Sequence, residues 1–195
     1  MTPWLSLVGA VFALLVLHLA TMAVVSRWVG LEPTVVHFGF GPALARRTLG
    51  GVALSIHAFP LGGSVENAKV EEARLPRPAA PSFVASSLLL LIGIAALGPG
   101  EGVAFAGTVV SAVFRGAISP AGDAQAIIAA GIAAIEAGPA VTIAARAAVA
   151  MAMFNLLLVT WVPLLRNNST LVVLGAVLPL VVSAPWLFAW AVYLL

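Results

Sequence analysis

The feature that most constrains this chain is an uncharged apolar run close to its N-terminus. Residues 4–25 form 22 consecutive positions without Asp, Glu, Lys or Arg. As an α-helix this run would be about 33 Å long, enough to cross the ~30 Å hydrocarbon core of a bilayer. The run therefore predicts a transmembrane helix, and any fold of this chain must accommodate it.

The composition of the whole chain supports a membrane protein. Of the 195 residues, 62% are hydrophobic and 8% are charged, whereas soluble domains carry about 25% charged residues. A net charge of +2 is too small to indicate a nucleic-acid surface. The chain has no Cys, which excludes disulfides and thiolate metal ligands.

The expected fold is an all-α polytopic membrane protein, a single membrane domain over residues 1–195 with about four transmembrane helices. Residues 34–40 and 51–59 are rich in β-branched and aromatic side chains, which predicts a small β-hairpin between the first and second helix. The apolar run over 103–114 is too short to span alone, so we expect an interfacial or re-entrant segment there. The expected elements are a helix over 4–27, a hairpin and linker over 31–81, a helix over 82–98, an interfacial segment over 102–138, and helices over 142–165 and 171–195.

The distribution of basic residues predicts how the chain sits in its membrane. Residues 31–81 hold five of the nine Lys and Arg, and loops rich in these residues stay on the cytoplasmic side. We therefore expect a multi-pass protein of the plasma (bacterial inner) membrane, with residues 31–81 cytoplasmic and both termini outside.

His18 lies inside the first apolar run. An ionisable side chain at membrane depth is costly without a partner, so it is a functional-site hypothesis by default. Several blocks in order accompany it, and together they resemble the site-2 protease family of intramembrane zinc metalloproteases. The blocks are Gly30, Gly39-Phe40-Gly41-Pro42, Pro60-Leu61-Gly62-Gly63-Ser64-Val65, Phe114-Arg115-Gly116 and Met153-Phe154-Asn155-Leu156-Leu157.

The resemblance also implies that catalysis is lost. In the family's His-Glu-x-x-His motif, two His hold Zn²⁺ and the Glu is the general base. Here His18 keeps the first ligand position, Leu19 replaces the base, Met22 replaces the second ligand, and Pro163 replaces the third ligand, an Asp. After Glu136 the chain contains no Asp, Glu or His, so we expect no catalytic residue, no metal and no bound zinc.

The resemblance therefore implies a scaffold that binds a peptide segment but does not hydrolyse it. We expect a pseudoprotease that is a binding, regulatory or assembly subunit in the lipid bilayer. Its partner would be a transmembrane or extended segment of another membrane protein, not a nucleic acid. The hairpin could pair with that segment by strand addition, or it could only plug the mouth of the helix bundle. The expected binding residues are His18 with Asn155 as its hydrogen-bond partner, and Gly39, Phe40, Gly41, Pro42, Pro60, Gly62 and Gly63, although turn geometry is the simpler explanation for the glycines.

Two other functions stay open. One is an intramembrane zinc metallopeptidase with an atypical site, for which His18, His37 and His57 are the histidines that the chain offers. The other is a purely structural subunit of a larger membrane complex.

Overall fold

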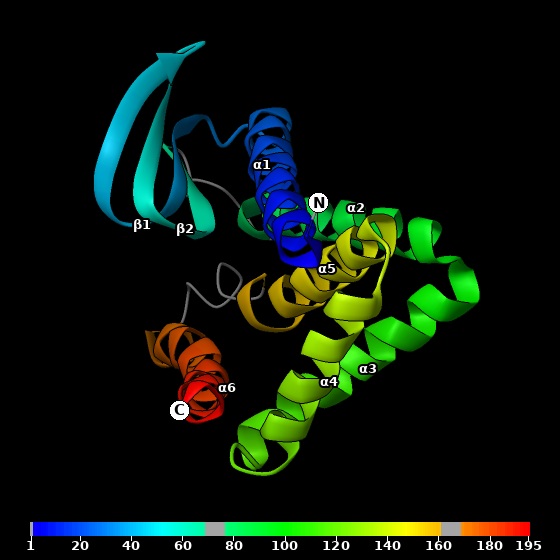
Figure 1. Cartoon of the computed structure of the whole chain (residues 1–195). Coiled ribbons are helices and arrows are strands. Elements are labelled where there is room, and N and C mark those ends of the chain that lie inside the picture. The colour runs from blue at the N-terminus through cyan, green and yellow to red at the C-terminus, as the bar shows by residue number, and fades with distance from the viewer. Residues whose placement is uncertain (1, 69–76, 161–168) are drawn as a thin grey trace.

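The computed structural model describes residues 2–68, 77–160 and 169–195 of a mostly helical chain (Figure 1). A two-stranded sheet interrupts the helices after the first of them. The elements in order are α1 (Pro3–Trp28), β1 (Pro33–Leu49), β2 (Val52–Asn67), the short 3₁₀ turn η1 (Arg77–Ala79), α2 (Ala80–Leu97), α3 (Pro99–Ile118), α4 (Asp123–Ala137), α5 (Ala140–Phe154), the π-helical turn η2 (Asn155–Val159) and α6 (Ser169–Leu194).

Five helices in the described ranges are long and apolar enough to cross a membrane. This is one more than the sequence predicted, and the additional helix is α3. The five segments are Pro3–Trp28, Arg77–Leu97, Pro99–Ile118, Ala140–Leu158 and Val177–Leu194.

The interfacial segment predicted over 102–138 is helical for most of its length. The segment contains most of α3, a turn and α4. Gly98, at φ +88°, ends α2, and Pro99 then begins α3 at the position where proline suits a helix. The uncharged run alone was too short to span, but the helix also includes Glu101 in its first turn and Arg115 in its last. An acidic side chain at the start of a helix and a basic one at its end interact favourably with the helix dipole. These charges are therefore compatible with a helix of 20 residues.

The other predicted helices are close to the observed ones. α1 and α2 match the predicted ranges within two residues at each end. The helix predicted over 142–165 is regular only as α5, and it continues into the π-helical turn η2. Residues 161–165 of that prediction lie outside the described residues. α6 contains Pro179 and Pro185 within one continuous helix.

The helices pack through small residues where α2 crosses α5. Gly93 of α2 faces the Ala145 carbonyl and the Val149 side chain of α5, and a Cβ on Gly93 would lie 2.6 Å from Val149 Cγ2. Ala148 and Ala152 of α5 are fully buried. Small side chains of this kind allow two helix backbones to approach closely, as in membrane helix pairs.

The predicted hairpin is present, but its strands are longer and more folded than expected. Residues 45–49 pair with 52–56 across the turn at Gly50 and Gly51. Residues 35–38 have partners on both sides, 63–66 on one and 53–56 on the other. Residues 53–56 likewise pair with both 35–38 and 45–48, so residues 35–38 and 53–56 form the centre of the sheet, and its edges are residues 43–49 and 63–67.

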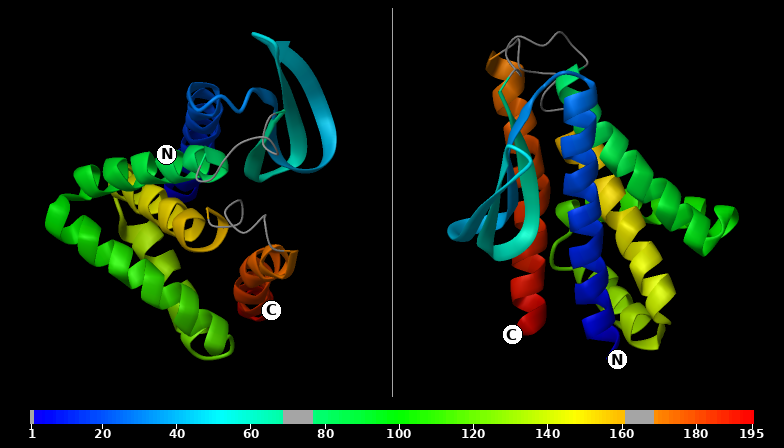
Figure 2. Two further views of the ribbon diagram at one scale, coloured as in Figure 1. Left: turned by 180° about the vertical axis from the view of Figure 1, so that it is seen from behind. Right: turned by 90° about the horizontal axis from the view of Figure 1, so that it is seen from above.

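Figure 2 shows how the sheet lies relative to the helices. The sheet runs alongside α1, with one face turned towards that helix. In the right-hand view the N-terminus of α1 and the C-terminus of α6 lie at the same end of the molecule. The sheet and the flank of α1 are thus the two surfaces from which a site can be built.

Candidate functional site

His18 is buried between helices, with 5% of its surface exposed. Its ring meets the backbone of Ala85 in α2. Its Nδ1 has no hydrogen-bond partner within the described part of the chain. The structure therefore places His18 in the helix core, where the sequence predicted it.

The predicted hydrogen bond between His18 and Asn155 is not formed. The Asn155 amide instead donates to the Met151 carbonyl at 2.9 Å, within its own helix. The Asn155 carbonyl accepts from both the backbone N–H and the hydroxyl of Thr160, at 2.9 and 3.0 Å. Asn side chains often bond to a nearby backbone in this way, and here the preceding turn of α5 supplies the local acceptor.

The positions where the family would hold its general base and second ligand lie in an apolar cluster. Leu19 is 2% exposed and packs with the buried Leu15 and Phe38. Met22 packs against this cluster, as do Val36, Val65 and Met151. The side chains that surround Leu19 in this cluster are therefore all hydrophobic. Pro163, the third degenerate position, lies outside the described residues.

Nothing in the described ranges assembles a metal site. No group of three or more His, Cys, Asp or Glu side chains there lies close enough together to hold a metal ion. His37 and His57 meet each other in the sheet, whereas His18 lies in the helix core. The three-histidine set that the sequence left open is therefore not brought together.

His37 and His57 form a hydrogen-bonded chain across the sheet. His37 Nδ1 lies 3.0 Å from His57 Nε2, and His37 Nε2 lies 3.0 Å from Glu66 Oε1. His57 Nδ1 lies 2.7 Å from the Gly41 carbonyl, and the Ser55 hydroxyl lies 3.0 Å from His57 Nε2. The chain links β1 to both halves of β2, so these histidines hold the folded sheet together.

The glycines predicted as binding residues shape the bends of the two strands. Gly39, Gly41 and Gly62 have φ values of +89°, +86° and +87°, a region that L side chains rarely adopt. The Phe59 ring lies over Gly41, and the Phe40 ring lies over Gly62. Turn geometry therefore accounts for these glycines. Pro42 lies in β1 just after the first bend, and Pro60 lies in β2 before the second.

Gly63 has a different role, because it is where the sheet meets the helices. A Cβ on Gly63 would clash with the His37 carbonyl and would lie 2.8 Å from Leu19 Cδ1. The absence of a side chain thus lets β2 lie directly on α1. Leu19, at the degenerate base position, is the residue that it contacts.

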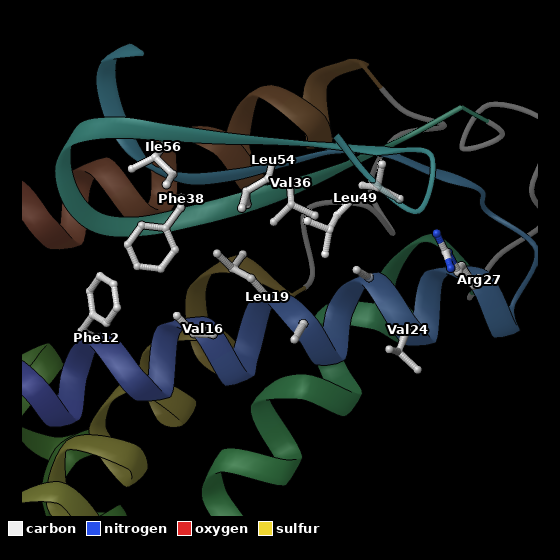
Figure 3. Close-up of a pocket in the computed structure, with 13 residues that line it drawn as sticks. Phe12, Val16, Leu19, Val24, Arg27, Val36, Phe38, Leu49, Leu54 and Ile56 are labelled. Atoms are coloured by element: carbon white, nitrogen blue, oxygen red, sulfur yellow. The ribbon is translucent and has the colours of Figure 1, made fainter. Parts of the chain in front are cut away.

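An apolar cavity of about 600 Å³ lies between α1 and the sheet (Figure 3). Phe12, Val16 and Ala20 are among the helix residues that line it. Phe38 and Leu54 are among the strand residues opposite. Sequence reasoning missed this cavity, although one face of α1 and alternate residues of both strands carried the apolar pattern that builds it.

No family model matches this chain, and no curated protein matches it either. The resemblance to site-2 proteases therefore remains a prediction that rests on the sequence motifs alone.

Proposed function

We propose that this chain is a catalytically inactive, site-2 protease-like membrane protein that binds a segment of a membrane partner. It is a multi-pass protein of the bacterial plasma membrane, with residues 31–81 on the cytoplasmic side. Its five apolar helices support a membrane location. The two chain ends lie at the same end of the molecule, which supports an even number of crossings with both termini on the same side, so not all five apolar helices would cross.

The observation that carries the proposal is the apolar cluster around Leu19 and Met22. Peptide hydrolysis by a metalloprotease needs a metal-bound water and a carboxylate base beside it. Here the corresponding part of α1 packs against Phe38 and Gly63 of the sheet. A site closed in this way can hold the sheet on the helix but cannot activate water.

The sheet edge over 43–49 provides a surface for binding. Every residue of this edge is exposed, and within the described part of the chain its pairing partners are all in residues 52–57. An unpaired edge offers a row of backbone donors and acceptors to which an extended segment can add as a further strand. Arg46 and Arg47 on the edge favour a segment that carries acidic side chains.

Metal analysis of the purified protein tests the loss of catalysis. We expect substoichiometric zinc, with no difference between the wild type and His18→Ala. Roughly one zinc per chain that disappears in His18→Ala would instead support a metallopeptidase with an atypical site.

Site-specific photo-cross-linking tests the binding surface. A photoreactive residue at Leu44 on the sheet edge should form one defined adduct with a membrane protein in native membranes. The matched control is Val141 at the start of α5, since the two side chains are 70% and 69% exposed. An adduct from both positions, or from Val141 alone, would contradict binding at the edge. An adduct at Leu44 that never exchanges with added partner would favour a purely structural subunit.

Single-cysteine labelling tests the orientation, because the chain has no Cys of its own. A Thr48→Cys variant should resist a membrane-impermeant thiol reagent in intact cells, whereas Thr2→Cys should react. The opposite pattern would reverse the proposed topology.

A further inference from the structure

The cavity between α1 and the sheet has the form of a binding slot for one hydrocarbon chain. We propose that it holds an acyl chain of an anionic phospholipid from the surrounding bilayer, with the headgroup at Arg27. This inference rests on the membrane location proposed above, but not on the binding of a partner at the sheet edge.

The walls of the slot are apolar along their whole length. On α1, Phe12, Val16, Ala20 and Ala23 recur at helical spacing and form one stripe. On β2, Val52, Leu54 and Ile56 alternate along the strand and therefore share the face that turns towards α1. Arg27 is the one charged residue among those that line the slot, so the occupant must be apolar with its polar group at a single end.

The dimensions of the slot decide between possible occupants. From Phe12 to Arg27 the helix rises by about 22 Å, so a volume of about 600 Å³ gives a mean cross-section of about 27 Å². A helix with side chains is about 10–12 Å in diameter, or roughly 80 Å² or more. A strand packed in a layered sheet takes about 4.8 by 10 Å, or roughly 48 Å². A single hydrocarbon chain fits within this cross-section, whereas a partner's helix or strand would have to lie partly outside the slot.

One end of the slot is closed by aromatic rings and the other end carries a cationic side chain, which suits a molecule with an apolar chain and a polar headgroup. At one end the Phe12 and Phe38 rings pack with their centroids 4.8 Å apart and close it (Figure 3). At the other end Arg27 donates from Nη2 to the Gly50 carbonyl at 3.0 Å, which fixes the guanidinium beside the turn of the hairpin. A guanidinium carries five N–H donors, and this bond uses one of them. Arginine binds phosphate well through paired donors.

The position of Arg27 along α1 favours a lipid of the bilayer over a soluble ligand. The next residue, Trp28, ends the helix and is 82% exposed. Exposed Trp at the end of an apolar helix is typical of the membrane–water interface. Arg27 would then lie at the depth of the cytoplasmic headgroups, and the slot would run from there along α1 towards the acyl chains. The strand residues that line the slot would therefore dip from the cytoplasmic side into the membrane.

Native mass spectrometry of the purified protein with added lipid tests the proposal. The probes are phosphatidylglycerol and phosphatidylcholine with the same chains, and free palmitate. We expect one phosphatidylglycerol per chain, held more tightly than phosphatidylcholine. An Arg27→Gln variant should bind phosphatidylglycerol about tenfold or more weakly, because it loses the charge-assisted bonds to phosphate. Arg115→Gln, at the end of α3 and outside the slot, is the matched control and should bind as the wild type does.

A variant that fills the slot tests where the lipid lies. Ala23→Trp should abolish binding of both phospholipids, whereas Ala133→Trp on the exposed face of α4 should not. Equal binding of the two phospholipids with no effect of Arg27→Gln would overturn the proposal, as would tighter binding of palmitate than of phosphatidylglycerol. If Ala23→Trp does not fold, the comparison of Arg27→Gln with the wild type still decides whether the phospholipid binds at Arg27. Failure here would leave the cross-linking result at Leu44 unaffected, so the two proposals fail separately.

Discussion

Replacing Gly93 by Ala tests the close crossing of α2 and α5 on which the helix core depends. The new Cβ would lie 2.6 Å from Val149 Cγ2, 2.8 Å from the Ala145 carbonyl oxygen and 3.1 Å from the Val149 backbone nitrogen. Two of these three atoms belong to the α5 backbone, so no side-chain rotation can relieve the overlap. The helices themselves would have to move apart.

The expected loss of stability follows from two opposing terms. Overpacking a close-packed core costs about 1–3 kcal/mol, and a contact with rigid backbone belongs in the upper part of that range. Replacing a Gly within a helix by Ala also stabilises that helix by about 1 kcal/mol, because Ala has the higher helix propensity. The net loss is therefore about 1–2 kcal/mol. For a chain of this length each kcal/mol shifts Tm by about 2–4 °C, so Tm should fall by about 2–8 °C.

Thermal unfolding in one mild detergent, followed by circular dichroism, measures this effect. Gly107→Ala in α3 is the matched control, because a Cβ there would meet no atom within 4 Å. Gly107→Ala should therefore gain helix propensity without any overpacking, and its Tm should rise by up to about 4 °C above the wild type. The reasoning is refuted if Gly93→Ala unfolds at or above the wild-type temperature.

Two further predictions concern the sheet. Gly63→Ala would place a Cβ against the His37 backbone carbonyl and near Leu19 Cδ1, so it should loosen the pairing of β2 with β1 and its contact with α1 at a cost of about 1–3 kcal/mol. Limited proteolysis would detect this as faster cleavage within the sheet with unchanged helix content, and unchanged cleavage would contradict the prediction. His57→Leu removes the partner of His37 Nδ1 and the bond to the Gly41 carbonyl, while His37 Nε2 keeps its bond to Glu66, so it should cost about 1–3 kcal/mol in thermal unfolding. Thr48→Val on the exposed edge is its control, and an equal loss in both variants would contradict the prediction.

The contact between Leu19 and Gly63 relates the fold to the proposed loss of catalysis. An acidic side chain at position 19 would face the apolar cluster that now holds the sheet on α1. Burying an unpaired carboxylate there would be costly. Leu19→Glu should therefore weaken the docking of the sheet on α1.

The sequence by itself determined the features that depend on short stretches of chain. The long apolar runs predicted α1, α2, α5 and α6, because hydrophobicity over about 20 residues is a local property. The β-branched and aromatic residues over 34–40 and 51–59 predicted a hairpin. The absence of Asp, Glu and His after Glu136 is also fixed by the sequence alone, and no fold can change it.

Only the tertiary structure decided which distant residues meet. The pairing of residues 35–38 on both sides, the bond between His37 and His57, and the contact of Gly63 with Leu19 join residues 18 to 44 positions apart. The partner of Asn155 was mispredicted because a local backbone acceptor competed with a distant side chain. The slot between α1 and the sheet exists because two apolar faces are held apart at one end by Arg27 and in contact at the other by Phe12 and Phe38. Such a space depends on the relative placement of two elements, which no local pattern specifies.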